Sequence, residues 1–387
     1  MCIRDSLVAS ALMMKGVLKL NAEEYPFPTE NVFTARVGIF EERFPEPADR
    51  FAFWEEVERR VAAVPGVASA TVAQSLPGLG SASSRFMVDG ESYAAAQDLP
   101  WARTVVATPA YAETFGVDPV RGRWLEQGDD AGATPVAVVN QRFAERFLPG
   151  AEALGRRIRL GGLDSDGPWV EIVGVVPNLR MEGVGNVEPG EETDQPGLYL
   201  PLAQQDGRFM SIAARARGTD PLALAAAVRD AVSAVDADTP VYFERTLRAA
   251  MDENLWFYRI FGTLFLVFGL AALFLASVGL YGVMSFSVTQ RTGEMGIRMA
   301  LGAQTGQVLR MILRQGLRQI LIGVAVGAVL AFAVARGLAL LLYQVEPWDP
   351  ATFTAVLILL ALTGMGASLV PALRATRVDP GVALRNE

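Results

Sequence analysis

The side chains that could do chemistry in this sequence are mostly carboxylates, and their spacing fits loops better than active sites. Asp129 and Asp130 are adjacent in a Gly-rich segment, where such a pair is far more often a solvated turn than an acid–base or metal site. Asp164 and Asp166 alternate as in a calcium loop, but no Glu stands at the twelfth position of the EF-hand pattern. We therefore predict that GGLDSDGPW, residues 161–169, is the loop of a hairpin.

The sequence has no His, one Cys and two Lys, and these absences exclude several kinds of site. Without His, Ser165 and Ser211 have no imidazole base, and a His-ligated zinc is excluded. Cys2 alone forms neither an internal disulfide nor a thiolate cluster. Because Lys15 and Lys19 stand outside any G-x-x-x-x-G-K-S/T loop, we expect no P-loop in this chain, and neither ATP nor another cofactor bound to it.

Hydropathy and charge divide the chain in two. Hydrophobic residues make up 51% of the chain and the mean hydropathy is +0.28, which indicates a membrane part. From position 256 onward there are ten Arg and five acidic residues, which leaves 24 basic and 37 acidic residues before it. The acidic region has no basic stripe that would suit nucleic acid, so we expect no nucleic-acid partner.

Three apolar stretches after position 256 predict membrane spans. Residues 260–286 are free of charge, and as a helix they are about 40 Å long against the roughly 30 Å of the bilayer core. A second span is predicted at about 317–343, where Arg336 can extend toward the nearer surface. The third predicted span, 351–373, has no charged residue.

The charges of the connecting loops predict the orientation of these spans. The first loop, 287–318, has five Arg and one Glu, whereas the second loop, 344–350, has two acidic residues and no basic one. By the positive-inside rule, the first loop and the C-terminus are cytoplasmic and residues from about 20 to 255 lie outside. An acidic domain of this size needs a segment that carries it across the membrane, but the apolar stretch 7–14 is only about 12 Å long as a helix. We interpret residues 1–30 as the remnant of a first transmembrane helix and a linker.

The fold predicted from these patterns is an α/β extracytoplasmic domain of two lobes, followed by an all-α membrane domain of three transmembrane helices. The outer domain covers 31–252, with a second lobe of about 110–200 inserted in the first, and the membrane domain covers 256–387. The predicted strands are 32–39, 67–73, 104–107, 135–140, 156–160, 169–176, 210–217 and 240–243, and the predicted helices are 49–64 and 220–235.

A short helix is predicted in the first cytoplasmic loop, at QRTGEMGIRMALGA, residues 290–303. Glu294 and Arg298 form an i,i+4 pair, and Met295 and Met299 repeat the same spacing on the neighbouring stripe. This helix could dock on another protein, or it could lie in the membrane interface and anchor the loop. Composition alone does not separate these two alternatives.

Three segments resemble one known family. Residues 291–303, RTGEMGIRMALGA, are similar to the segment E-x-G-I/L-R-x-A-L/I-G-A of the permease subunits of MacB-like and FtsX-like ABC transporters. The closing PALRATRVDPGVALRNE, 371–387, resembles the family's P-x-x-R-A-x-x-x-D-P-x-x-A-L-R. TPAYAETFGVDPVRGRWLEQGDD, 108–130, followed by PVAVVNQRFAERFLPG, 135–150, resembles its periplasmic core. The resemblance covers nearly the whole chain from about position 31.

The resemblance implies a multi-pass protein of the bacterial inner membrane with one span, a periplasmic core domain of two lobes and three more spans. It implies a permease subunit that couples ATP hydrolysis by a separate ABC ATPase to movement of the periplasmic domain, for efflux or for mechanotransmission. Its partners would be that ATPase, membrane lipid, a second permease copy or half that makes a dimer and, in some cases, a periplasmic adaptor. This chain would then be truncated at its N-terminus or be the second half of a duplicated permease. The residues that the resemblance assigns to an ATPase-coupling helix are Glu294, Gly296, Ile297, Arg298, Ala300, Leu301, Gly302 and Ala303.

Two further features bear on function. Gly323 and Gly327 form G-x-x-x-G, which could let the second span pack closely against another helix, although this spacing is common by chance. A membrane-anchored extracytoplasmic sensor or ligand-binding protein is the alternative function, since it would account for the two α/β lobes. A membrane-bound hydrolase is a weaker alternative because the chain has no His and Lys only at two positions.

Overall fold

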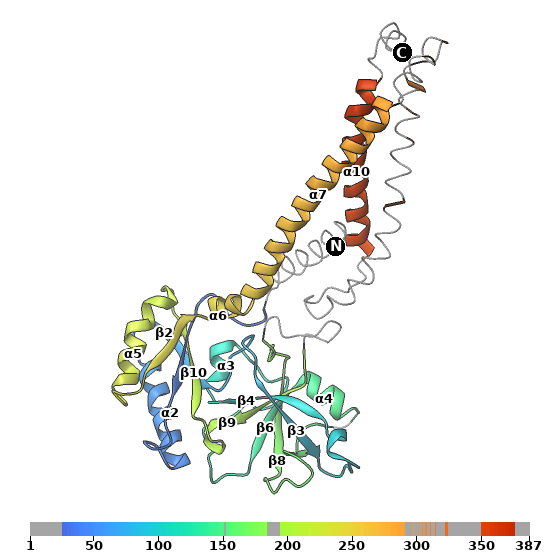
Figure 1. Ribbon diagram of the computed structural model, residues 1–387. Helices are drawn as coiled ribbons and strands as arrows, with labels where there is room; N and C mark the ends of the chain where they lie inside the picture. Colours follow the sequence, from blue (N-terminus) through green and yellow to red (C-terminus); the bar gives the residue numbers. More distant parts are fainter. Residues whose placement is uncertain are drawn as a thin grey trace. The chain divides into compact units, whose positions relative to one another are not determined.

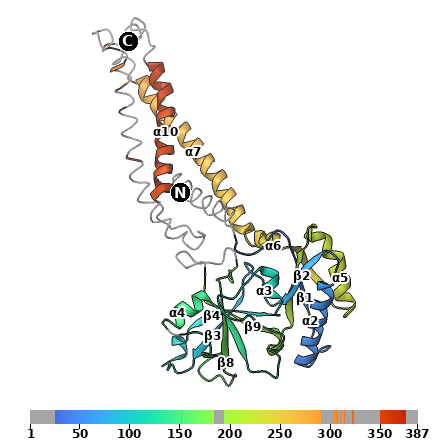
Figure 2. The same cartoon turned by 180° about the vertical axis from the view of Figure 1, so that it is seen from behind.

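The computed structural model describes residues 25–150, 152–183, 194–290 and 350–375, with nine single positions between 297 and 323. The chain divides into two compact units, one of which ends at Trp256 while the other continues from Phe257. Figures 1 and 2 show the elements of both units from opposite sides. The predicted remnant of a first span lies outside the described residues up to position 24, and so do nearly all of the predicted span 317–343 and the end of the chain after 375.

The first unit is an α/β domain, as predicted. Its described strands are β1 (Val32–Gly38), β2 (Val67–Ala73), β3 (Ala82–Val88), β4 (Trp101–Ala107), β5 (Arg121–Gly122), β6 (Val136–Asn140), β7 (Arg157–Leu160), β8 (Val170–Val176), β9 (Gly197–Pro201), β10 (Phe209–Ala216) and β11 (Val241–Thr246). Its described helices are α2 (Pro47–Ala62), α3 (Tyr111–Phe115), α4 (Gln141–Phe147), α5 (Ala225–Ser233) and α6 (Leu247–Asn254), with 3₁₀ turns at Ala96–Asp98, Leu202–Gln204 and Pro221–Leu224.

Four strands form an antiparallel sheet in the order β11, β1, β10 and β2. Residues two apart on a strand share a face, so Phe33, Ala35 and Val37 of β1 enter one buried cluster with Trp54 and Val57 of α2. Helices α2 and α5 pack together, and α2 contacts β2 and β10. The short helices contact strands of the same sheet, α3 at β2 and β10 and α6 at β1 and β11.

The open edge of this sheet is β11. Its pairing with β1 shifts register between Thr34 and Arg36, which is the signature of a β-bulge. Phe243 lies at the bulge with a φ of 55°, a backbone conformation that a bulky side chain rarely adopts. The bulge bends the edge strand away from a straight course.

Six further strands close a ring in the order β4, β3, β7, β8, β6 and β9, because β9 pairs in parallel with β4. The sheet joins the ring where β2 meets β4 at Ala73 and Ala107. The ring includes β3 and β4, which precede position 110, together with strands from the predicted second lobe. The limits of 110–200 for that lobe stay a prediction.

An aromatic cluster fills part of the core enclosed by the ring of six strands. The centroid of the Phe86 phenyl group, on β3, lies 4.9 Å from the phenyl centroid of Phe143 and 5.0 Å from that of Phe147, both on α4. Helix α4 begins at Asn140, whose Oδ1 accepts a hydrogen bond from Phe143 N at 2.8 Å. The cap fixes the start of α4 and so the place of the two aromatic rings.

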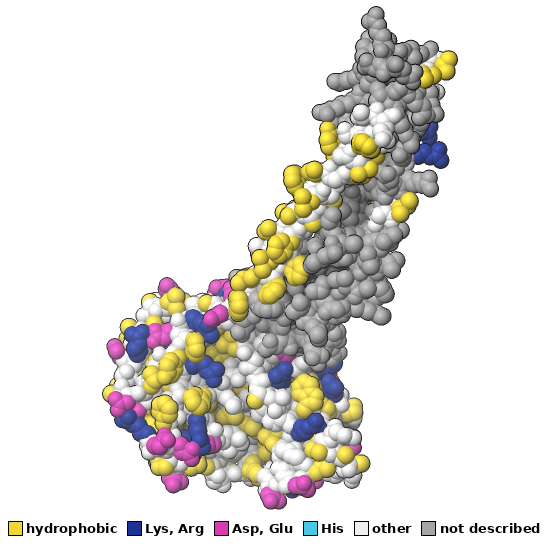
Figure 3. Space-filling view, viewed as in Figure 1, with side chains coloured by type: hydrophobic (Ala, Val, Ile, Leu, Met, Phe, Trp, Pro, Cys, Tyr) yellow, Lys and Arg dark blue, Asp and Glu magenta, His cyan; other side chains and the backbone are white. Residues whose placement is uncertain are grey.

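The second unit contains two long described helices, α7 (Trp256–Gln290) and α10 (Pro350–Ala375). Within α7, Ile260–Gln290 has a mean hydropathy of 2.4 and is, among the described residues, the one helix long and apolar enough to cross a membrane. Its large apolar side chains are exposed, as Phe268, Phe274 and Phe286 show at 60, 68 and 65%. Figure 3 shows hydrophobic side chains exposed along this helix, and such a surface fits contact with lipid better than contact with water.

Polar groups in both long helices are satisfied within the helix. Ser277 Oγ donates to Leu273 O at 2.7 Å, and Thr363 Oγ1 donates to Leu359 O at 2.7 Å. Hydroxyls that bond to the carbonyl four residues earlier do not need water, which a membrane interior lacks. The helix α7 contains the first predicted span, 260–286, and α10 contains the third, 351–373. The crossing of the membrane three times stays a prediction.

Candidate functional site

The predicted coupling helix is described at two of its positions. Leu301 N donates to Ile297 O at 3.0 Å, which is the i to i+4 bond of an α-helix. The side chains of Ile297 and Leu301 are 48 and 82% exposed. These two side chains are apolar, one helical turn apart and accessible. The six other residues assigned to this helix lie outside the described residues, and they are Glu294, Gly296, Arg298, Ala300, Gly302 and Ala303.

The structure describes one of the two glycines of the G-x-x-x-G motif predicted in the second span. Gly323 is helical, and a Cβ built on it would meet no atom within 4 Å. Gly327 lies outside the described residues. Close packing of a helix at this G-x-x-x-G stays a prediction.

Helix α6 joins the α/β unit to the membrane helix. Leu255 alone separates α6 from α7, and its backbone is still close to helical, with φ −95° and ψ −3°. Leu247, Ala250 and Met251 of α6 are buried, and the helix contacts β1 and β11. The connection between the two helices is therefore one residue long.

Gly78, in the loop after β2, lies beside Met251 of α6. A Cβ built on Gly78 would lie 2.6 Å from Met251 Cε, and Gly78 has a φ of +77°. The backbone conformation therefore favours glycine, and the end of the Met251 side chain fills the space beside it. Thr246 caps α6 by accepting a hydrogen bond from Ala249 N at 3.1 Å, and Arg245 forms an ion pair with Glu253. These contacts hold α6 against the loop that follows β2 and against the edge strand.

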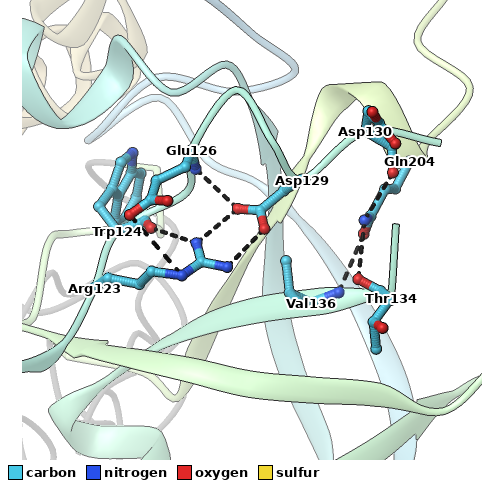
Figure 4. Close-up of polar contacts among 8 residues, drawn as sticks. All are labelled: Arg123, Trp124, Glu126, Asp129, Asp130, Thr134, Val136 and Gln204. Atoms are coloured by element: carbon cyan, nitrogen blue, oxygen red, sulfur yellow. Dashed lines mark hydrogen bonds and ion pairs between the residues drawn. The ribbon is translucent and has the colours of Figure 1, made fainter. Parts of the chain in front are cut away.

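The prediction that Asp129 and Asp130 are both solvated is correct for Asp130 and wrong for Asp129. Asp130 is exposed, but Asp129 is 5% exposed and forms two hydrogen bonds with Arg123, at 2.8 and 2.7 Å (Figure 4). Glu126 N also donates to Asp129 at 2.8 Å. Burial opposes ionisation of Asp129, but the hydrogen bonds from Arg123 and Glu126 N outweigh it and lower its pKa. The carboxylate closes a loop, and among the described residues no group of three metal-binding side chains occurs.

The hairpin loop 161–169 is confirmed. It connects β7 and β8, which pair antiparallel. Ser165 Oγ donates to Leu160 O at 2.8 Å and accepts from Gly167 N at 3.3 Å, so this hydroxyl organises the turn. Ser211 is buried on β10, in the sheet. The structure thus gives both serines places in the framework of the α/β unit.

A half-buried carboxyl that the sequence analysis missed lies at the junction of the sheet and the ring. Glu58 of α2 accepts hydrogen bonds from Val72 N at 3.0 Å and from the hydroxyl of Thr108. Thr71 Oγ1 lies 2.8 Å from Thr108 Oγ1 and extends the network. Burial raises the pKa of Glu58 to about 7, against the lowering effect of its hydrogen bonds. Glu58 stands four residues after Trp54 on the apolar stripe of α2, which was the available signal.

Comparisons with known proteins identify the family. The profile of the MacB-like periplasmic core domain matches residues 6–234, and that of the FtsX-like permease C-terminal domain matches residues 266–380. The chain belongs to the MacB/FtsX-like family of ABC transporter permeases. Members of this family are membrane-embedded transporters and work with an ABC ATPase. The α/β unit of this permease is thus a MacB-like periplasmic core domain.

The relatives differ in how much of their length they share with this permease. Pyoverdine export ATP-binding/permease protein PvdT of Pseudomonas putida is 28% identical over 295 residues, which are 72% of this chain and 42% of PvdT. The uncharacterized ABC transporter permease YvrN of Bacillus subtilis is 26% identical over 303 residues, which are 72% of this chain and 71% of YvrN. The chain therefore spans less than half the length of PvdT.

Solved structures also resemble this permease. The crystal structure of the periplasmic region of MacB from Actinobacillus actinomycetemcomitans is 13% identical and covers 58% of this chain and 92% of that chain, with a TM-score of 0.39. The extracellular domain of the ABC-type transporter YknZ from Gram-positive bacteria is 12% identical and covers 55% of this chain and 100% of that chain, with a TM-score of 0.36.

Proposed function

We propose that this chain is the transmembrane subunit of an ABC transporter, in which a separate ATPase drives movement of the periplasmic domain for efflux or force transmission. The observation that carries the proposal is the connection of α6 to α7 through Leu255. A one-residue connection leaves little slack, so a displacement of the membrane helix is passed to a helix seated on the periplasmic sheet. A flexible linker would absorb the same displacement.

The separate ATPase is supported by one relative. In this proposal ATP is bound by the partner. The chain matches 71% of YvrN, which is named as a permease, whereas PvdT is named as an ATP-binding/permease protein and is matched over 42% of its length. In this proposal Ile297 and Leu301 are the apolar contacts of the coupling helix, since both are exposed and one turn apart.

The remaining parts of the proposal concern topology and partners. The chain would cross the bacterial inner membrane with spans at about 260–286, 317–343 and 351–373, with residues from about 20 to 255 periplasmic and the C-terminus cytoplasmic. It would pair with a second permease copy or half, and a periplasmic adaptor would complete some assemblies. The alternative, a membrane-anchored sensor, predicts no ATPase partner.

Affinity capture tests the ATPase partner. The full chain in lipid nanodiscs should retain an ABC ATPase from the same membranes, and Leu301→Asp should lose it because a charge then faces an apolar seat. Leu163→Asp, a change at an exposed position in the periplasmic hairpin loop, is the matched control and should retain the ATPase. Capture of no ATPase by either the wild type or the control would favour the sensor.

Insertion at the α6–α7 connection tests the transmission of movement. Four flexible residues, Gly-Ser-Gly-Ser, inserted after Leu255 should leave ATPase binding intact but remove the ATP-driven distance change between spin labels on the periplasmic domain and on α7. The same insertion in the hairpin loop 161–169 should leave that distance change in place. An ATP-driven change that survives insertion after Leu255 would refute transmission through this connection.

A further inference from the structure

A pocket of about 400 Å³ opens where the sheet meets the closed ring of the α/β unit. This volume is within the range of pockets that hold small molecules, and the junction of two substructures is a common place for them. Side chains of the ring strands and Met210 of β10 form its wall, and residues 205–209, which lead into β10, form its rim. The wall residues that matter for binding are Ser84, Thr104, Val106, Leu160, Leu200 and Met210.

Thr104 gives the pocket a polar group that needs a partner. Thr104 is 6% exposed, and its hydroxyl has no hydrogen-bond partner among the described residues. A buried hydroxyl without a partner is costly, so most such groups in proteins are satisfied. Thr104 stands on β4 between β3 and β9, which fixes its backbone on both sides. A ligand with a hydrogen-bonding group would satisfy this hydroxyl.

The rim of the pocket is fixed by contacts with α2. Trp54 Nε1 donates to Gly207 O at 2.7 Å, and Trp54 is fully buried. Arg50 Nε lies 2.6 Å from Asp206 Oδ1, and Arg50 is 4% exposed. A Cβ on Gly207 would lie 2.8 Å from Leu202 Cδ1, so the rim packs closely against this side chain. The pocket is therefore formed before a ligand arrives, which lowers the entropic cost of binding.

The charges at the rim are paired with each other and with neighbours. Asp206 meets Arg50, and it also meets Arg208, whose Nε lies 3.5 Å from Asp206 Oδ2. Arg208 Nη1 lies 2.6 Å from Glu41 Oε2. A ligand with a net charge would have to compete with these pairs, whereas a neutral ligand would not.

We propose that this pocket binds a neutral amphipathic small molecule. Its apolar part contacts Val106, Leu160 and Leu200, and its polar group forms a hydrogen bond with the hydroxyl of Thr104. The proposal concerns binding by the periplasmic domain and does not depend on the coupling of this permease to an ATPase.

Photolabelling of the full chain in lipid nanodiscs tests the proposal. The probe is trifluoromethyl-diazirine benzyl alcohol, a neutral molecule with an apolar ring and one hydroxyl, and labelled peptides are mapped by mass spectrometry. Peptides that contain Val106, Leu200 or Met210 should be labelled to saturation, while α7 provides an internal reference for partitioning into lipid. Ser84→Trp fills the pocket and should reduce this labelling at least fivefold. Ser83→Trp, an exposed neighbour on the opposite face of β3, should not.

The hydroxyl is tested separately. Thr104→Val has nearly the same shape but no hydroxyl, so half-saturation should need about three- to tenfold more probe, as expected for one hydrogen bond. Thr104→Ser keeps the hydroxyl and should stay within about twofold of the wild type. The melting temperature of Thr104→Val should not fall, because the change removes an unpaired polar group. Labelling that rises linearly with probe concentration, or that is equal in Ser84→Trp and Ser83→Trp, would overturn the proposal.

Discussion

The half-buried carboxyl of Glu58 makes the stability of the periplasmic domain depend on pH in an unusual direction. Its pKa is raised by burial from 4.5 to about 7. Between these two values the unfolded chain loses the proton while the folded domain keeps it. The free energy of unfolding contributed by Glu58 therefore falls as the pH rises from about 4.5 to about 7 and is constant above that. A difference of this size corresponds to about 3 kcal/mol.

The substitution that isolates this effect is Glu58→Gln, which keeps an oxygen that can accept from Val72 N and Thr108 but cannot ionise. At pH 8 the variant should be more stable than the wild type by up to about 3 kcal/mol, which for a domain of this size is a rise of roughly 6–12 °C in melting temperature. At pH 4.5 the two proteins should melt within about 2 °C of each other, since the wild-type carboxyl is then protonated in the folded domain and about half protonated in the unfolded chain, which leaves only a small difference in proton binding.

The assay is thermal unfolding followed by tryptophan fluorescence, on the full chain in nanodiscs, at half-unit steps from pH 4.5 to 8.5. Trp54 is buried on the same helix as Glu58 and reports on the packing of α2. Glu113→Gln changes an exposed carboxyl on α3 and serves as the control, with the same pH profile as the wild type. If the difference in melting temperature between Glu58→Gln and the wild type does not change with pH, the reasoning is refuted.

Three substitutions test other contacts of the periplasmic domain. Gly78→Ala should destabilise it by about 1–3 kcal/mol, because a left-handed backbone and the contact with Met251 both oppose a Cβ; thermal melting measures this. Asp129→Asn should cost about 2 kcal/mol near neutral pH through its bonds to Arg123. Because the pKa of Asp129 is lowered, that loss should disappear as the pH falls below the folded pKa, which melts across an acid series would show. Asn140→Ala should cost about 2–3 kcal/mol and speed amide exchange at the start of α4, since it removes the helix cap and a bond to Gly197 N.

Much of the fold could be predicted because the relevant signals are local. The apolar, β-branched runs 67–73 and 135–140 correspond to β2 and β6 within a residue, and the predicted helix 49–64 overlaps α2 from Pro47. Pro at the start of α2 and Gly66 after it, with a φ of +93°, are the kind of boundary that sequence patterns report well. The apolar stretch 260–286 lies within α7 for the same reason.

What the sequence did not predict depends on partners distant in the chain. Strand β3 was missed because its first half is exposed and rich in Ser, and only its pairing with β4 and β7 makes it a strand. Strand β9 was missed because it follows a Gly- and Glu-rich stretch. The closure of the ring by β4 and β9 joins residues roughly 94 apart and leaves no local pattern.

The roles of individual side chains were also hard to predict where they depend on partners in other elements. Asp129 looked like half of a solvated pair, because its burial depends on Arg123 folding back over it, which a turn-like sequence does not reveal. Glu58 could have been found as an acid on an apolar helical stripe, but its partners, Val72 N and Thr108, come from two other elements. The coupling helix was assigned from resemblance, and that assignment stays a prediction beyond Ile297 and Leu301.

The bulged edge strand β11 has a consequence for crowding in the bilayer. Among the described strands β11 pairs only with β1, so its other side presents a free row of backbone donors and acceptors. Phe243 kinks that row, and the pair of Glu244 with Arg229, at 2.5 Å, places charge beside it. Neighbouring copies held at high local density by their membrane anchors are thereby kept from zipping together strand by strand, and any association between them must use side chains instead.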